Sequence, residues 1–410
     1  MRKLLATVLT AFAVVATTVL PASAGNNITD PWWGMIVEDG IHHQPTVNYG
    51  SIQITASWRQ IETSPGVYDF TAVDAEVAKA ESLHKQILLN LAGTPTFWAS
   101  KPTQTGSFFG GGLGASSAPS NMTAWSNFVK ALAAHYGTRV SYMAWNEPCV
   151  IGFWTGTKVQ MVQMMVLAYN EVKAATAGAG QVVSPACPIR LSSQKKYLTS
   201  LYGTAYSAKK PANVIDVGAI NPYPTSSQTP EATLTNVKWF RTMLNNKGAK
   251  TKPIWVTEVN YGMVSMTSAL ALSDATQQSF IVRNNVLLAG SGIQRMQWFS
   301  WDMYHQGVKL TNFYDWVNLR PAGKSWQVSH SWLNNTSVNP CVKNSVGVFS
   351  CVAVAPDGEI RRIYWRTSGT SSVAAALGAF SKEDVNGVAT PIAPAAKFTV
   401  STSPVMVRSH

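Results

Sequence analysis

Short apolar segments alternate with amphipathic segments through the middle of the chain. Each apolar segment has the length of a strand, and together they give eight expected strands: 33–37, 51–55, 86–91, 140–145, 182–184, 214–220, 254–257 and 295–299. Between them apolar residues recur at helical spacing, which predicts helices at 73–83, 123–136, 158–175, 193–208, 234–245 and 274–289. Strands that alternate with helices form a parallel sheet covered by helices. Eight such units predict an α/β fold, a (β/α)8 TIM barrel.

The pattern changes beyond residue 333. Short alternating segments follow at 346–354, 359–365, 371–377 and 397–407, with Pro-Asp-Gly and Asn-Gly turns between some of them. Such a pattern is typical of antiparallel strands with one buried face. We therefore expect a signal peptide at 1–24, a barrel at 25–333 and a small antiparallel β-domain, similar to a β-sandwich, at 334–410.

The first residues have the composition of an export signal. Arg2 and Lys3 precede an apolar run at 4–20, and small residues at 22–24 follow Pro21. This order predicts a secretory signal peptide cut after Ala24, and therefore an extracellular protein. A membrane anchor is the alternative, but the run is short for a span of roughly 20 residues and ends in a cleavage-type sequence. No later apolar run is long enough to cross a bilayer, so we expect no membrane span in the mature chain.

Charged residues make up only 13% of the chain, about half the usual share. The formal charge is +12 for the full sequence, and +10 remains once the two basic residues of the signal peptide are removed. This surplus favours anionic surroundings such as cell-wall polymers or acidic glycans, although a generally basic secreted surface explains it as well. The basic residues are dispersed or occur in pairs rather than in a stripe, so we expect no nucleic-acid partner.

Four cysteines in an exported chain indicate two disulfides, for which three pairings are possible. We expect Cys149 to pair with Cys187, since each follows a predicted strand. Cys341 and Cys351 then form the second pair across a short segment. The sequence has neither a CxxC pair nor an HExxH motif, so we expect no metal and no other cofactor.

Catalytic residues of such a barrel lie at the carboxyl ends of its strands, which makes acidic residues directly after a strand the first candidates. The chain has only 20 acidic residues, so this filter is severe. It retains Glu38 and Asp39 after the first strand, Glu147 after the fourth, Glu258 after the seventh and Asp302 after the eighth.

Two of these acidic residues lie in motifs. Residues 143–148 read Met-Ala-Trp-Asn-Glu-Pro, and residues 254–262 read Ile-Trp-Val-Thr-Glu-Val-Asn-Tyr-Gly. They resemble the fourth-strand and seventh-strand motifs of the retaining (β/α)8 glycoside hydrolases of clan A. Residues 58–62, Trp-Arg-Gln-Ile-Glu, and 64–70, Ser-Pro-Gly-Val-Tyr-Asp-Phe, strengthen the resemblance. It extends from Trp32 to Asp302 and is greatest to family 39, with families 5 and 42 as alternatives.

The resemblance implies a role for each motif residue. Glu147 is expected to be the acid/base, Glu258 the nucleophile, and Asn146 the residue that holds the sugar 2-hydroxyl. Retention requires one protonated carboxyl group for the leaving oxygen and one ionised carboxylate about 5 Å away. Two carboxyl groups in one cleft hinder each other's ionisation, so the acid keeps its proton near neutral pH.

The sixth strand departs from the clan pattern. Many members carry a His-x-Tyr pair there, whereas this chain reads Asn221-Pro222-Tyr223. Tyr223 is expected to bond the nucleophile, and Asn221 either replaces the histidine as a donor that does not titrate or belongs only to a turn. Aromatic faces match the C–H faces of a sugar, so we expect the tryptophans near strand ends to contact the substrate. These are Trp33, Trp58, Trp98, Trp154 and Trp301. The resemblance implies that Trp301 stacks on the reactive sugar. Glu38 is included among the substrate-binding candidates.

These observations predict a secreted retaining glycoside hydrolase. Its substrate would be a plant or microbial cell-wall polysaccharide or oligosaccharide, cleaved by double displacement. A non-catalytic glycan-binding barrel is one alternative. Another is a cell-wall-associated binding protein that uses the C-terminal β-domain for attachment. Serine-nucleophile hydrolysis is disfavoured because no Gly-x-Ser-x-Gly motif occurs.

Overall fold

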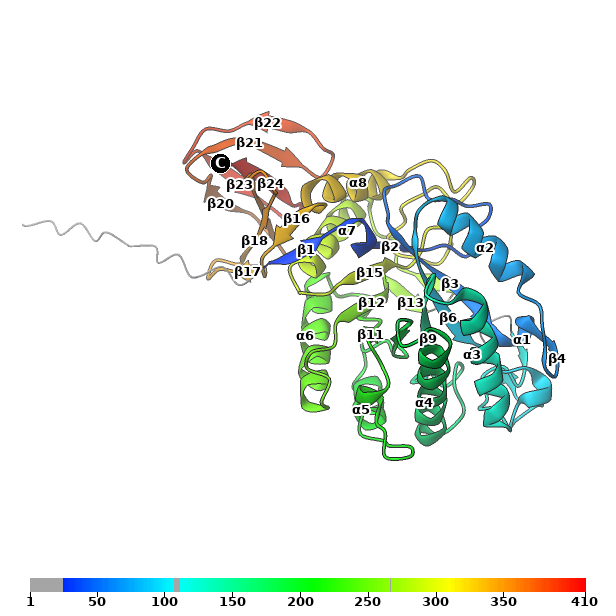
Figure 1. Cartoon of the computed structure of the whole chain (residues 1–410). Helices are drawn as coiled ribbons and strands as arrows, with labels where there is room; N and C mark the ends of the chain where they lie inside the picture. The colour runs from blue at the N-terminus through cyan, green and yellow to red at the C-terminus, as the bar shows by residue number, and fades with distance from the viewer. Residues whose placement is uncertain (1–24, 107–110, 266) are drawn as a thin grey trace, which may run out of the picture.

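The computed structural model describes residues 25–106, 111–265 and 267–410. The predicted signal peptide at residues 1–24 lies outside the described residues, so it stays a prediction. Figure 1 shows a large body of strands and helices, with a smaller group of strands from the C-terminal part of the chain lying beside α7 and α8. None of the described helices combines the length and the hydropathy needed to cross a membrane.

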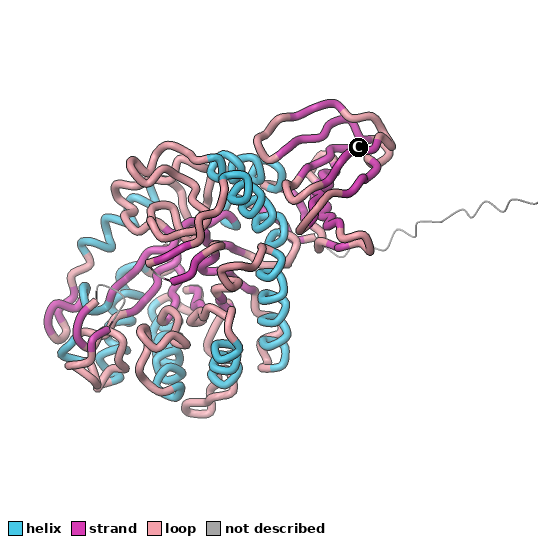
Figure 2. Tube along the Cα trace, turned by 180° about the vertical axis from the view of Figure 1, so that it is seen from behind, coloured by secondary structure: helices cyan, strands magenta, loops and turns pink. Residues whose placement is uncertain are grey.

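Eight parallel strands form the barrel: β2 (Trp33–Ile36), β3 (Ser51–Ser57), β6 (Gln86–Ala92), β9 (Val140–Ala144), β10 (Gln181–Val183), β11 (Gly218–Ile220), β12 (Ile254–Val259) and β15 (Arg295–Trp298). Each strand lies beside its neighbours in the sequence, in the order β10-β9-β6-β3-β2-β15-β12-β11. Parallel bridges from Val183 to Val217 and from Pro188 to Asn221 link the two ends of this sheet. The strands lie inside a layer of helices (Figure 2), and the predicted barrel is confirmed.

The barrel strands are apolar on both faces, as strands of a parallel sheet must be when helices cover the outside. Along β6, Leu88 packs inside the barrel with Met143 and Val183. The next residue, Leu89, belongs to the large core that lies mainly under the helices. This alternation places every second side chain on the barrel axis, so residues just beyond the strand ends reach the cleft.

Seven helices of ten or more residues surround or follow the barrel: α2 (Thr71–Ser82), α3 (Met122–Tyr136), α4 (Lys158–Ala175), α5 (Ser192–Leu201), α6 (Glu231–Asn246), α7 (Asp274–Ala289) and α8 (Pro321–Leu333). A single turn, α1 (Trp58–Ile61), follows β3. The helix expected at 193–208 ends early, because the chain turns at Gly203 and Tyr206 then pairs with Lys209. No helix separates β2 from β3, so the long loop between them is free to line the cleft.

An antiparallel sheet follows the barrel. Its strands are β16 (Thr336–Val338), β17 (Val342–Lys343), β18 (Val348–Val354), β19 (Ile360–Arg366), β21 (Ala379–Asp384), β22 (Ala389–Pro391) and β24 (Val405–Ser409). A second pair, β20 (Ser371–Ala374) and β23 (Lys397–Val400), packs Phe398 and Val400 against it. The segment expected as one strand at 397–407 is therefore two strands from different pairs. Short hairpins decorate the barrel: β4 (Glu62–Ser64) with β5 (Val67–Tyr68), β7 (Thr105–Gly106) with β8 (Gly112–Leu113), and β13 (Met263–Ser265) with β14 (Ser268–Ala269).

The start of the described chain joins this C-terminal sheet. Strand β1 (Asn26–Ile28) pairs antiparallel with β16, so Asn26 lies opposite Val338. The side chain of Asn26 also donates to the carbonyl oxygens of Ala289 and Ile293. Residues 26–28 thus belong in space to the sheet rather than to the barrel, and they tie the sheet to the end of α7.

Both expected disulfides are present, Cys149–Cys187 and Cys341–Cys351. The first joins the loops that follow β9 and β10, beside Glu147. The second crosses the hairpin of β17 and β18. Closing loops of 38 and 10 residues restricts the unfolded chain and stabilises the fold by about 3 to 4 kcal/mol each in the loop-entropy description.

Glu231 connects the barrel to the C-terminal sheet. Its carboxylate accepts bonds from Arg283 on α7, and Trp365 on β19 donates its indole N–H over 2.7 Å. Arg283 is almost fully buried. Although burial alone would raise the pKa of Glu231, the hydrogen bonds and charge of Arg283 lower it below its usual value. The carboxylate of Glu231 therefore neutralises the buried charge of Arg283 where the barrel meets the C-terminal sheet.

We expect Glu231→Gln to lower the free energy of unfolding by about 3 kcal/mol at neutral pH, since it leaves Arg283 buried without a counter-charge. The contribution of a carboxylate with a lowered pKa is present above its unfolded pKa and is lost as the pH falls through the folded pKa. Urea denaturation at pH 7 and at pH 3 measures both effects. The control is Glu81→Gln, which breaks the exposed pair with Arg139 and should cost under about 1 kcal/mol. Equal losses in the two variants would contradict the role of Glu231.

Candidate active site

A strained turn presents the first carboxylate. Strand β9 ends at Ala144, and the backbone φ of Trp145 and Glu147 is +102° and +45°, a region that residues other than glycine rarely occupy. The buried indole N–H of Trp145 donates to the carbonyl of Phe153 over 3.0 Å and holds the turn. Asn146 and Glu147 are thereby fixed at the carboxyl end of β9, where strain of this kind is found at functional sites.

The second carboxylate lies on β12. Glu258 is 7% exposed, as is Glu147, so both are buried but not fully sealed from solvent. Asn146 donates its side-chain N–H to one oxygen of Glu258 over 3.1 Å, and the Tyr223 hydroxyl donates to the other oxygen over 3.1 Å. The two motifs singled out from the sequence are therefore joined directly through Asn146 and Glu258.

Asn221 occupies the position of the missing histidine and does more than form a turn. Its Nδ2 donates to Glu147 over 2.7 Å, and its Oδ1 accepts from the Thr257 hydroxyl over 2.7 Å. Because the Thr257 hydroxyl donates to the oxygen of the Asn221 amide, the amide is oriented with its N–H group toward Glu147. An amide donor keeps this geometry at every pH, which a histidine would not.

Both carboxyl groups have raised pKa values. Burial raises the pKa of Glu147 to about 7, against the opposing effects of the Asn221 hydrogen bond and the charge of Arg190. Burial, and then repulsion from Glu147, raises the pKa of Glu258 well above its usual range. Two like charges in one enclosed site ionise in coupled steps, so the pair retains one proton over a wide pH range. Two hydrogen bonds to Glu258, against one to Glu147, favour the negative charge on Glu258, whereas the charge of Arg190 favours it on Glu147.

Two of the tryptophans expected at the cleft are in the core. Trp58 is fully buried against Trp125 and Phe128 and donates its N–H to Glu62. Trp33 is equally buried among other rings. The predicted contacts of Trp33 and Trp58 with a sugar are therefore wrong. Proximity to a strand end gives a residue's height in the barrel but does not say whether its ring faces the axis or the helices.

The other three tryptophans differ in their surroundings. Trp98 is partly exposed and donates its indole N–H to Glu62 over 2.9 Å. Trp154 packs edge-on against Trp145, behind the turn that carries Glu147. Trp301 is 1% exposed and donates its N–H to the carbonyl of Trp316 over 3.0 Å. Sugar contacts of these three rings stay a prediction.

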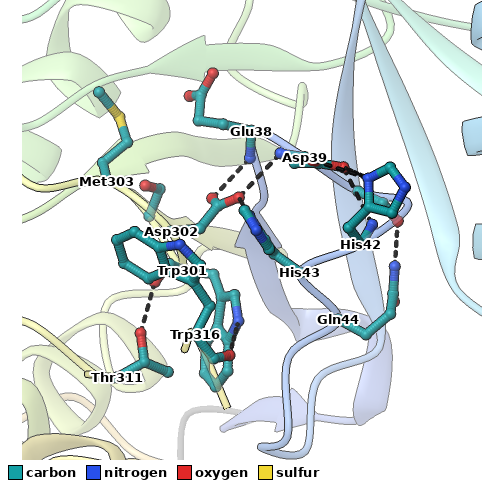
Figure 3. A network of polar contacts seen from close by, with 12 residues as sticks. Glu38, Asp39, His42, His43, Gln44, Trp301, Asp302, Met303, Thr311 and Trp316 are labelled. Atoms are coloured by element: carbon teal, nitrogen blue, oxygen red, sulfur yellow. Dashed lines mark hydrogen bonds and ion pairs between the residues drawn. The ribbon is translucent and has the colours of Figure 1, made fainter. Parts of the chain in front are cut away.

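A third group of acidic residues lies where β2 and β15 end. The buried carboxylate of Asp302 accepts from the backbone N–H groups of Glu38 and Asp39 over 2.8 and 2.9 Å, and it contacts His43 Nδ1 over 2.9 Å. Figure 3 shows this network, with the Glu38 side chain extending away from Asp302. Asp302 therefore positions a loop, and Asp39 bonds His42 at the surface.

Sequence reasoning did not find Arg190, Thr257 or His43. Arg190 lies three residues after Cys187, and its guanidinium is 5.7 Å from the centre of the Tyr223 ring. The expected disulfide could have directed attention to it, because Cys187 is anchored beside Glu147. In the described ranges, no three histidine, cysteine, aspartate or glutamate side chains are grouped as metal ligands would be.

Comparison with known proteins was made by sequence and by structure. No protein-family model matches the sequence, and no curated protein matches it. Solved structures do match. A family 39 glycoside hydrolase from Bacteroides cellulosilyticus superimposes with a TM-score of 0.70 at 14% identity, over 94% of this chain and 82% of that one. The chain has the fold of the family 39 glycoside hydrolases.

Two further solved structures also match over nearly the whole chain at low sequence identity. A monomeric β-xylosidase from Caulobacter crescentus gives a TM-score of 0.65 at 15% identity, over 94% of this chain and 97% of that one. A family 30 endoxylanase from Clostridium papyrosolvens gives 0.62 at 10% identity, over 95% and 98%. Coverage this large includes most of the C-terminal sheet as well as the barrel. The predicted resemblance is confirmed at the level of the fold.

The pH dependence of stability tests the buried pair without any substrate. A carboxyl group whose folded pKa is raised stabilises the fold fully below its unfolded pKa, and this contribution is lost as the pH rises through the folded pKa. Between pH 5 and pH 8 the wild-type free energy of unfolding should therefore fall relative to that of Glu147→Gln, by up to about 3 kcal/mol. Glu171→Gln on α4 is the control and should keep the wild-type slope. Urea titrations across this range give the result, and parallel slopes for all three proteins would show that Glu147 is not enclosed.

Proposed function

We propose that the chain is a secreted retaining glycoside hydrolase that cleaves a plant or microbial cell-wall polysaccharide or oligosaccharide. One observation carries the proposal: Glu147 and Glu258 are buried in one cleft at the ends of β9 and β12, and each is held by amide or hydroxyl donors rather than by a basic residue. Cleavage of a glycosidic bond uses two carboxyl groups, one that keeps a proton for the leaving oxygen and one that is ionised. The barrel fold shared with glycoside hydrolases supports the same reaction class.

The first half of the reaction forms a covalent intermediate. Glu147, carrying the shared proton, donates it to the glycosidic oxygen while the ionised Glu258 attacks the anomeric carbon. The bond from that carbon to the leaving oxygen breaks, and an ester between the sugar and Glu258 forms. Asn146 bonds Glu258 and, by the family resemblance, also the sugar 2-hydroxyl, so it orients nucleophile and substrate together.

The second half restores the enzyme. Once Glu258 is esterified, its charge is gone and the pKa of Glu147 falls, so Glu147 is an ionised base. It takes a proton from water, and the resulting oxygen attacks the anomeric carbon and releases Glu258 as a carboxylate. The product keeps the configuration of the substrate because two displacements occur at the same carbon.

The location of the protein outside the cell is part of the proposal. Two disulfides within the described chain are compatible with an oxidising compartment. Xylose-based polysaccharides and aryl xylosides are the first substrates to test, since two matching structures are named as a β-xylosidase and an endoxylanase. A screen of aryl glycosides and purified wall polysaccharides with the mature protein identifies the sugar and linkage.

Replacing either carboxylate should abolish turnover. We expect Glu147→Gln and Glu258→Gln each to lower kcat by about three orders of magnitude or more without changing the fold, because each removes one chemical role. Glu171→Gln, outside the cleft, is the matched control. Azide should partly rescue Glu258→Ala by giving the α-glycosyl azide from a β-glycoside, and should give the β-anomer with Glu147→Ala.

Retention of substrate binding in both variants would agree with this assignment. A variant that keeps near wild-type turnover on a natural glycan would contradict the catalytic pair. Binding of glycans by a wild-type protein that hydrolyses none of them would instead favour the alternative of a glycan-binding barrel.

The configuration of the first product separates the two possible mechanisms. Under double displacement, the released sugar should first appear with the anomeric configuration of the substrate. Proton NMR of the sugar within the first minutes, before mutarotation, records it. Commercial retaining and inverting glycosidases on the same substrate are the controls. An inverted first product would mean that Glu258 activates water, and no covalent intermediate would form.

A further inference from the structure

Glu38 follows strand β2 at the carboxyl end of the barrel. The strand ends at Ile36, and Glu38 begins the turn that comes after it. Ile36 packs with Tyr223 and Phe299. The Tyr223 hydroxyl donates to Glu258, and the charge of Glu38 is close enough to Glu258 to repel its ionised form. Glu38 therefore belongs to the same end of the barrel as Tyr223 and Glu258.

The backbone of Glu38 is fixed while its carboxylate is free. The Asp302 carboxylate accepts hydrogen bonds from the backbone N–H groups of Glu38 and Asp39. His43 Nδ1 contacts the same carboxylate (Figure 3). The Glu38 side chain extends away from this network, and the residue is exposed. Among residues 25–106, 111–265 and 267–410, none forms an ion pair or a hydrogen bond with the Glu38 carboxylate. The buried carboxylate of Asp302 thus fixes the backbone of an acceptor that is unpaired and whose charge acts on Glu258.

We propose that Glu38 makes the subsite beside Glu258 selective for a neutral sugar, through acceptance of hydrogen bonds from its hydroxyl groups and repulsion of a sugar that carries a carboxylate. This inference rests on the proposed glycosidase function and names the class of sugar that is attacked. A carboxylate can accept from two adjacent hydroxyl groups, and hydrogen bonds to a charged acceptor are stronger than those between neutral groups.

A uronic acid in the same subsite would bring a further negative charge against Glu38 and the ionised Glu258. Glu258 is buried, where solvent screening is weak, and the charge of Glu38 already acts on it, so a further like charge between them is repelled. The positive surplus of the whole chain does not cancel this effect, because Glu38 has no basic partner among the described residues. The acidic partners predicted from net charge would then bind outside the subsite beside Glu258.

The test compares two substrates that differ only in this charge. The first is the neutral aryl glycoside that the wild-type enzyme hydrolyses in the screen, and the second is the aryl uronide of the same configuration. We expect a wild-type preference in kcat/KM of at least about 100-fold for the neutral glycoside. Glu38→Gln should lower kcat/KM for the neutral glycoside by about 10-fold and reduce the preference by at least about 10-fold. Competitive inhibition by the free sugar and by its uronic acid gives the same comparison without turnover.

Two further variants make the result specific. Asp39→Asn removes the charge next to Glu38 in the sequence. The Asp39 side chain bonds His42 at the surface, so this variant should keep the wild-type preference for the neutral glycoside. Glu38→Asp keeps the charge and should still reject the uronide while binding the neutral sugar more weakly. This variant also keeps the proposal testable should Glu38→Gln fail to fold.

The possible failures are distinguishable. An active wild-type enzyme that accepts the uronide as readily as the neutral glycoside overturns the role of Glu38 and leaves the glycosidase function intact. The same holds if Glu38→Gln and Asp39→Asn change the preference equally. A wild-type protein without hydrolytic activity on any glycan in the screen overturns the proposed function itself.

Discussion

The burial of Glu147 and Glu258 in a single cleft is the constraint on which the rest of the site depends. Two carboxylates removed from water repel each other and cannot both ionise, so one proton is shared between them. The fold must then supply hydrogen-bond donors that carry no charge of their own. Asn146, Asn221 and Tyr223 supply them. An arginine or lysine in contact with either carboxylate would lower its pKa and remove the proton that bond cleavage needs.

These donors and the carboxylate of Glu258 come from three different strands, which explains why the barrel must close. Asn146 follows β9, Asn221 and Tyr223 follow β11, and Glu258 is part of β12. The bridge from Pro188 to Asn221 and the disulfide Cys149–Cys187 both cross the region where β10 meets its neighbours. The barrel strands are shortest there, at three residues each in β10 and β11, and only isolated bridges join the two, so the disulfide stabilises a thinly paired part of the wall next to Glu147.

Periodicity predicted the barrel, and topology then placed five acidic residues at the edge where parallel strands end. The resemblance of two motifs to those of clan A singled out Glu147 and Glu258 among them. The direction of a side chain could not be predicted in the same way. Trp58 lies in the core, where its N–H donates to the buried Glu62. Strand β1 was missed since three residues carry no readable alternation. Its partner, Val338, lies more than 300 positions away.

The net charge of the surface and the charges beside Glu258 act over different distances, and they can favour ligands of different charge. The formal surplus of +10 on the chain after the signal segment is spread over dispersed surface residues. Its effect on an approaching polymer fades within a Debye length of about 8 Å at physiological salt. At the site itself the charges are fixed at short range: Glu38 repels the ionised form of Glu258, and Arg190 favours the ionised form of Glu147. Under the proposed function, a basic surface would hold the protein near anionic wall material while the carboxylates around Glu258 would select an uncharged sugar from it, because each interaction is confined to its own distance.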